Sequence, residues 1–107
     1  MSVIKVVRYT TKPESAEDNA RMIREVFAEL ASQRPAGLRY AAFRLDDGVS
    51  FVHVAELDDA SRNPLAASEA FAKFQAGIAE RCAHGPTAAD ATVIGAYQLP
   101  VGSADQD

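Results

Sequence analysis

The sequence predicts an α+β domain with the element order β-α-β-β-α-β, the ferredoxin-like arrangement in which two helices cover one face of a four-stranded antiparallel sheet. Two observations lead to this prediction. Residues 37–57, GLRYAAFRLDDGVSFVHVAEL, are typical of a long β-hairpin that turns at Asp47-Gly48. An amphipathic helical pattern lies on each side of this hairpin, and a strand-like run lies at the outer end of each helix.

The first strand and helix are predicted from residue type and spacing. Residues 3–10, VIKVVRYT, are rich in β-branched side chains that favour a strand. Pro13 ends the strand, and the residues SAED at 15–18 resemble a capping box that starts a helix. Pro35 stops this helix near Gln33, because the residue before proline avoids the α conformation. The apolar stripe of the helix consists of Ala20, Ile23, Val26, Phe27, Leu30 and Ala31.

The hairpin has a predicted register because its turn sequence is specific. Asp-Gly favours a two-residue type I′ turn, in which both turn residues take a positive φ. Asp46 then faces Val49, and the strand pairs are Arg44 with Phe51, Ala42 with His53, Tyr40 with Ala55, and Arg39 with Glu56. One face of the hairpin carries Leu38, Tyr40, Ala42, Arg44, Phe51, His53, Ala55 and Leu57.

Both faces of the hairpin are largely apolar, and this pattern predicts that the protein associates with a second subunit. The opposite face carries Phe43, Val52 and Val54, so two helices on one side would leave apolar side chains in water. A second copy of the same sheet would cover them, and we therefore predict a homodimer that forms through the sheet face. The pattern leaves open which of the two faces meets the helices.

The second half of the chain follows the same alternation. A short helical turn is expected at 64–67, and Ser68 is expected to cap a second helix that ends at Gly85-Pro86. Residues 91–99, ATVIGAYQL, predict the last strand, which Pro100 closes. We therefore expect one domain over residues 1–100 and a loose polar tail over 101–107 unless a partner subunit holds it. The apolar stripe of the second helix consists of Phe71, Phe74, Ile78 and Cys82.

Composition narrows the classes of partner. The formal net charge is −4 and the chain has no run of Lys or Arg, so nucleic acid and anionic membranes are poor partners. No apolar run approaches the ~20 residues of a membrane span, and no signal-peptide pattern opens the chain, so a cytoplasmic protein is expected. With Cys82 as the one cysteine, disulfides and cysteine-based metal sites are not expected, and we predict no cofactor.

Three stretches resemble the antibiotic biosynthesis monooxygenase group of the dimeric α/β-barrel superfamily: VVRYTTKPES before the first helix, VAEL at 54–57, and SEAFAKFQAGI in the second helix. The resemblance implies that two sheets pair into a barrel and that a ligand cavity lies between the sheet and the helices of each subunit. It implies either a cofactor-independent monooxygenase acting on an aromatic or polyketide-like molecule, or a non-catalytic assembly or small-ligand-binding protein.

The resemblance also argues against haem degradation. The histidine, asparagine and tryptophan that haem-degrading members use would fall near Gln75, Val7 and Leu65, and the chain contains no tryptophan. Where other members have a His-Phe pair entering the second helix, this chain has Ala70-Phe71.

His53, Tyr40 and Arg44 are the candidate catalytic residues, because the predicted register puts them on one face of the hairpin. His53 would act as the base, Tyr40 would orient the substrate, and Arg44 or Arg8 would stabilise its oxyanion. The alternative interpretation is that His53 is a hydrogen-bonded core or dimer-interface residue.

Arg8, Tyr9, Arg62 and Asn63 are the candidate ligand-binding residues, the last two because the connecting segment should form the rim of a cavity. The alternative for Tyr9, Tyr40 and Tyr97 is that they serve as packing residues with a hydroxyl partner, as tyrosines more often do. Three further residues have structural interpretations: Arg39 in an ion pair with Glu56, His84 at the end of the second helix, and Cys82 as a core thiol.

Overall fold

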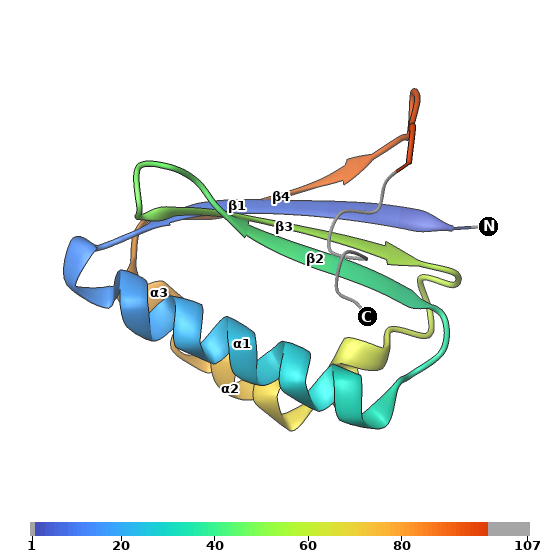
Figure 1. The fold of residues 1–107 in the computed structure, drawn as a ribbon, viewed down its shortest axis with the longest axis horizontal. Helices are drawn as coiled ribbons and strands as arrows, with labels where there is room; N and C mark the ends of the chain where they lie inside the picture. Colours follow the sequence, from blue (N-terminus) through green and yellow to red (C-terminus); the bar gives the residue numbers. More distant parts are fainter. Residues whose placement is uncertain (1, 99–107) are drawn as a thin grey trace.

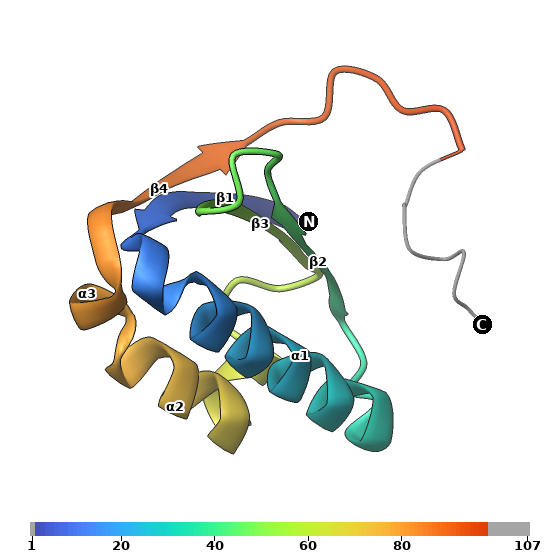
Figure 2. The ribbon, with the colours of Figure 1, turned by 60° about the vertical axis from the view of Figure 1, so that its left-hand side comes forward.

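A computed structural model describes residues 2–98 and confirms the ferredoxin-like α+β fold. The elements are β1 (Val3–Thr11), η1 (Pro13–Ser15), α1 (Ala16–Gln33), β2 (Leu38–Arg44), β3 (Ser50–Leu57), η2 (Pro64–Ala67), α2 (Glu69–Ala76), α3 (Ile78–Arg81) and β4 (Cys82–Ala91). The four strands form one antiparallel sheet in the order β2-β3-β1-β4. The helices lie on one side of this sheet, as Figures 1 and 2 show from two directions.

The predicted hairpin register is confirmed, although the predicted turn type is wrong. Arg44 lies opposite Phe51, and Ala42 lies opposite His53. Only Gly48 takes a positive φ in the turn, so the turn is not type I′. The hairpin instead has a loop over residues 46–49, closed by the Leu45 N–H bond to the Ser50 carbonyl at 2.8 Å. The Asp47 carboxylate accepts hydrogen bonds from the backbone N–H groups of Val49 and Ser50, at 3.0 and 2.8 Å, and these bonds favour this longer loop.

The face of the hairpin that meets the helices is the one with His53. Phe51, His53 and Leu57 are buried, and on β1 Tyr9 pairs with Phe51 and is buried with it. Helix α1 covers them with Ala20 and Val26, and the second helical segment adds Phe74. The predicted ion pair between Arg39 and Glu56 lies outside this core, with 2.8 Å between Nε and Oε1.

The predicted end of the second helix is wrong. Helical structure ends at Arg81, and Cys82 begins β4, so His84 and Gly85-Pro86 belong to a strand and do not cap or end a helix. Within residues 2–98, β4 is an edge strand that pairs with β1 alone, and proline is tolerated there because one side of an edge strand makes no ladder bonds. Cys82 remains half-buried against the core, as expected for its thiol, although from a strand.

The predicted last strand over 91–99 is also wrong for the residues described. β4 ends at Ala91, and residues 92–98 have no helix or strand although they are richer in β-branched residues than β4. Pairing to β1 therefore outweighs local β propensity here. Leu99, Pro100 and the predicted tail over 101–107 lie outside the described residues.

Two glycines lie at positions where a side chain would strain the backbone. Gly48 and Gly85 both have a positive φ, but a Cβ at Gly48 would meet nothing within 4 Å, whereas one at Gly85 would lie 3.0 Å from the Arg8 carbonyl oxygen. We expect Gly48→Ala to lower the free energy of unfolding by ~1–2 kcal/mol and Gly85→Ala by ~2–4 kcal/mol, because the second adds a backbone clash to the strain. Urea unfolding of both variants measures this, and equal losses would contradict the crowding seen at Gly85.

Candidate ligand-binding site

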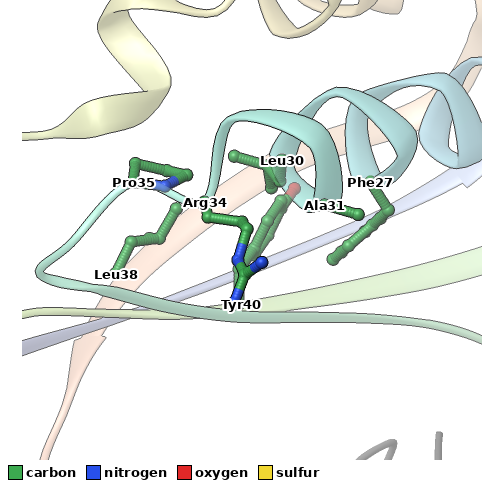
Figure 3. Close-up of a pocket in the computed structure, with 7 residues that line it drawn as sticks. All are labelled: Phe27, Leu30, Ala31, Arg34, Pro35, Leu38 and Tyr40. Carbon is green, nitrogen blue, oxygen red and sulfur yellow. The ribbon is translucent and has the colours of Figure 1, made fainter. Parts of the chain in front are cut away.

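An apolar pocket of about 290 Å³ lies between the C-terminal half of α1 and the beginning of β2. In Figure 3 the Tyr40 ring extends from β2 toward α1, with its hydroxyl at the α1 end. The ring stacks on Phe27 with 4.8 Å between centroids, so two aromatic rings form part of the wall. The lining residues are Phe27, Leu30, Ala31, Arg34, Pro35, Leu38 and Tyr40.

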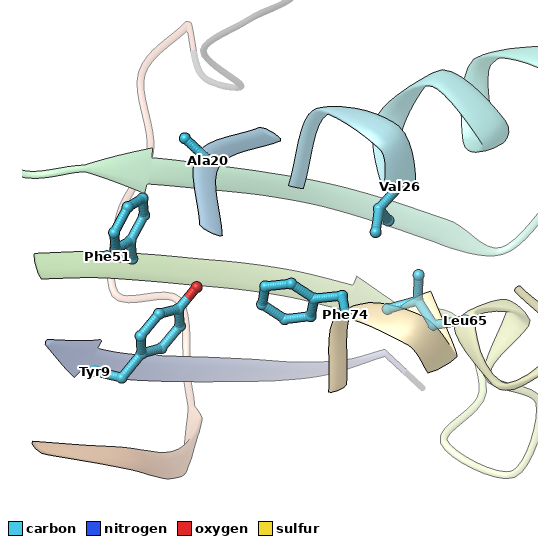
Figure 4. Packing of buried hydrophobic residues seen from close by; sticks show 6 residues of the cluster. All are labelled: Tyr9, Ala20, Val26, Phe51, Leu65 and Phe74. Carbon is cyan, nitrogen blue, oxygen red and sulfur yellow. The ribbon is translucent and has the colours of Figure 1, made fainter. Parts of the chain in front are cut away.

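Beneath this wall, His53 is buried between two tyrosines. Its Nδ1 lies 2.6 Å from the Tyr40 hydroxyl, and its Nε2 lies 2.8 Å from the Tyr9 hydroxyl. The Tyr9 ring in turn lies in the hydrophobic cluster with Phe51 and Phe74, shown in Figure 4. The register predicted His53 and Tyr40 on one face, and the structure brings both together with Tyr9.

Asn19 and Arg81 extend this series of hydrogen-bonded groups, and neither was predicted from the sequence. The fully buried Asn19 of α1 donates from Nδ2 to the Tyr9 hydroxyl at 2.9 Å. Arg81 Nε donates to Asn19 Oδ1 at 3.0 Å, and Arg81 Nη2 donates to the Phe74 carbonyl at 2.8 Å. An asparagine at helical spacing beside the apolar stripe was the available signal, since a polar residue on a buried face needs a partner.

The direction of these hydrogen bonds follows from what each group can donate. Arginine only donates, so the Asn19 oxygen faces Arg81 and its NH₂ faces Tyr9. Tyr9 accepts from Asn19 and has its own proton left to donate to His53 Nε2. The neutral imidazole then carries its proton on Nδ1 and donates it to Tyr40.

With these directions, the Tyr40 hydroxyl proton is the last donor in the series of hydrogen bonds. Within residues 2–98 the Tyr40 hydroxyl has no hydrogen-bond partner other than His53. The opposite direction would leave the Tyr9 proton without an acceptor in the core, where an unmet donor costs roughly 1–3 kcal/mol. Tyr40 is also one of the residues that line the pocket.

The buried environment keeps His53, Tyr9 and Tyr40 neutral. Burial lowers the pKa of His53 to about 4. Burial also raises the pKa of Tyr9 to about 12, although the Asn19 hydrogen bond opposes this shift, and it raises the pKa of Tyr40 well above its usual value. At neutral pH the site therefore presents uncharged hydrogen-bonding groups.

The remaining candidate residues lie apart from this cluster. The Arg44 guanidinium pairs with Glu17 at 2.9 Å and donates to the Gly48 carbonyl, at the far end of the hairpin. Arg8 is exposed on the opposite face of the sheet, since its neighbour Val7 pairs with His53. Arg62 is exposed, and Asn63 caps η2 by accepting from the Leu65 N–H at 2.9 Å.

Two kinds of feature are not found in the part of the chain that the structure describes. Residues 2–98 contain no group of three or more His, Cys, Asp or Glu side chains placed to hold a metal ion. No helix among them combines the length and the apolar character needed to cross a membrane.

Fold and pocket together define a small ferredoxin-like α+β protein with an open apolar pocket between helix and sheet. Neither protein-family models nor curated proteins match the sequence. Solved structures do match, and they confirm at the level of fold the resemblance to antibiotic biosynthesis monooxygenases.

Three of these structures illustrate the likeness. A structure named antibiotic biosynthesis monooxygenase is 21% identical over 87% of this chain and 99% of its own, with a TM-score of 0.71. A putative antibiotic biosynthesis monooxygenase from Nitrosomonas europaea is 15% identical over 87% and 90%, with a TM-score of 0.71. A variant of SnoaB, a cofactor-independent oxygenase from Streptomyces nogalater, is 19% identical over 92% and 98%, with a TM-score of 0.67.

The buried imidazole predicts a pH dependence of stability. Below pH 6.5 the unfolded chain protonates His53, whereas the folded chain resists protonation down to about pH 4. Stability from this group is therefore complete above pH 6.5 and falls by up to roughly 3 kcal/mol as the pH drops toward 4.

Urea unfolding at pH 7 and pH 4.5 checks this expectation in the wild type and in His53→Gln, whose side chain does not titrate. The variant should lose less stability on acidification than the wild type. The matched control is His84→Gln, which replaces the second histidine of the protein, on the edge strand β4. This variant should lose as much stability on acidification as the wild type. Equal losses in all three proteins would mean that His53 is not held neutral.

Proposed function

We propose that this protein binds a small, mostly apolar aromatic molecule that carries a hydrogen-bond acceptor oxygen. The observation that supports this most is the Tyr40 hydroxyl, which accepts from His53, has no acceptor for its own proton within residues 2–98, and belongs to a residue that lines the pocket. Few, well-placed polar groups in an apolar cavity are typical of small-molecule sites. The stacked rings of Phe27 and Tyr40 favour a flat ligand.

Cofactor-independent oxygenation of a bound phenol is the second candidate function. The fold is shared with a protein named as such an oxygenase, and the Tyr40 proton could stabilise a phenolate oxygen. His53 is a weak base for this reaction. Moving a proton from a phenol of pKa ~10 to an imidazole of pKa about 4 costs ~8 kcal/mol, so the resting site supports binding better than deprotonation.

The proposal includes a homodimer in the cytoplasm. On the sheet face away from the helices, Val6 pairs with Val54 and Phe43 pairs with Val52, and all four side chains are half-buried or exposed. A second copy of this sheet is the occupant whose chemistry matches, because its own face is equally apolar. The reducing cytoplasm suits a half-buried free thiol at Cys82.

Removing the Tyr40 hydroxyl tests the binding proposal. We expect Tyr40→Phe to weaken binding of 1,4-naphthoquinone and 1-naphthol about five- to tenfold, because about 1 kcal/mol of hydrogen bonding is lost. Isothermal titration calorimetry gives the dissociation constants, and Tyr97→Phe, at an exposed tyrosine away from the pocket, is the matched control.

Three outcomes decide between the candidates. Unchanged affinity in Tyr40→Phe would remove Tyr40 from the site, and no binding of either compound to the wild type would contradict the proposal. Oxygen uptake by the wild type with 1-naphthol, lost in Tyr40→Phe and kept in Tyr97→Phe, would extend the function to oxygenation.

A charge on the open sheet face tests the homodimer. The wild type should sediment at twice the 11.4 kDa mass of the chain, and Phe43→Lys should shift it toward the monomer, because a buried lysine at the interface would be unpaired. Phe43 is 38% exposed in the single chain, so the monomer should tolerate the change.

Ala28→Lys is the control for added charge, since Ala28 lies on the exposed side of α1. Analytical ultracentrifugation measures all three proteins. A monomeric wild type, or equal dissociation of both variants, would count against dimerisation through the sheet.

A further inference from the structure

Arg34 is the one charged residue among the seven that line the pocket. Within residues 2–98, no carboxylate lies within ion-pairing distance of its guanidinium. Arg21, Arg39 and Arg44 each pair with Asp or Glu side chains. Arg8, Arg24 and Arg62 are exposed and unpaired like Arg34 within the described residues, but they lie outside the pocket lining. An arginine without a carboxylate partner at the wall of an apolar pocket has its donors free for a ligand.

The backbone at Arg34 is also unusual for this residue type. Arg34 ends α1 with φ 52° and ψ 55°, in the left-handed conformation that helix ends usually assign to glycine or asparagine. Its N–H donates to the Leu30 carbonyl at 2.7 Å. This backbone hydrogen bond ends the helix without any help from the arginine side chain, so glycine could occupy the position equally well. Arg34 therefore has a long side chain at a position whose backbone conformation favours glycine.

We propose that the ligand is an aromatic carboxylic acid, or a closely related organic anion, whose acidic group pairs with Arg34. This inference rests on the binding function proposed above and specifies its ligand class. The apolar body would lie against Phe27 and Leu38, and an oxygen of the ligand would accept the Tyr40 proton. Because the protein has a net charge of −4, preference for an anion must come from a local cation and not from the overall field.

A matched pair of probes separates charge from shape. 2-Naphthoic acid and 2-naphthamide share the ring and the carbonyl, and only the acid is an anion at pH 7. We expect the wild type to bind the acid about five- to tenfold more tightly at low ionic strength, with the preference reduced by salt, as for a partly exposed ion pair.

Three variants locate the preference. Arg34→Gln should bind acid and amide equally, and Arg24→Gln, at an exposed arginine of α1 outside the pocket lining, should keep the wild-type preference. Arg34→Gly should lose the preference while its melting temperature rises by about 4 °C, because glycine relieves the left-handed strain. A gain in stability with a loss of selectivity is not expected of a residue that only supports the fold.

Each other outcome overturns the proposal in a recognisable way. If the wild type binds acid and amide equally, the binding function stands and the anionic ligand class is wrong. If Arg34→Gln weakens both probes equally, Arg34 acts through the packing of its aliphatic stem. If neither probe binds and the quinone and naphthol also fail, the binding function and this inference fail together.

Discussion

A buried imidazole needs a hydrogen-bond partner on each nitrogen, and the arrangement around His53 meets this need with groups from separate elements. Tyr9 comes from β1 and Tyr40 from β2, while His53 itself lies on β3. Asn19 then joins this sheet cluster to α1, and Arg81 joins it to the end of α3. Because an unmet polar group in the core is costly, each of these elements is held at a set distance from the others.

The same network determines what the site can do. Its fixed donor at one end, Arg81, sets the direction of every later bond and leaves the proton of Tyr40 without an acceptor within residues 2–98. The desolvation that keeps His53 neutral also makes it a weak base. Burial of His53 thus accounts both for the ordered hydrogen bonds around it and for its low basicity. Both properties favour recognition of a ligand oxygen over removal of a ligand proton.

Most of the fold could be predicted from local patterns. The hairpin register survived an error in turn type, because the observed loop closes between Leu45 and Ser50 and is centred on the same Asp47-Gly48 pair as the predicted turn. β4 could not be predicted, since CAHGPTAADA has little strand propensity and pairs through its position beside β1. Residues 92–98 show the reverse case, with Ile94 fully exposed and no strand partner within the described residues.

For the site, residue alternation was enough to predict that His53 and Tyr40 share a face, because side chains alternate with period two along a strand. It did not determine that Arg44 turns away to Glu17, since long side chains on one face can reach different partners. The packing of helices on the sheet shows which face meets the helices, and it brings Asn19, Arg81 and the Arg34 pocket to that side. The reason is that periodicity describes one element at a time, whereas a buried network and a cavity depend on the distances between elements.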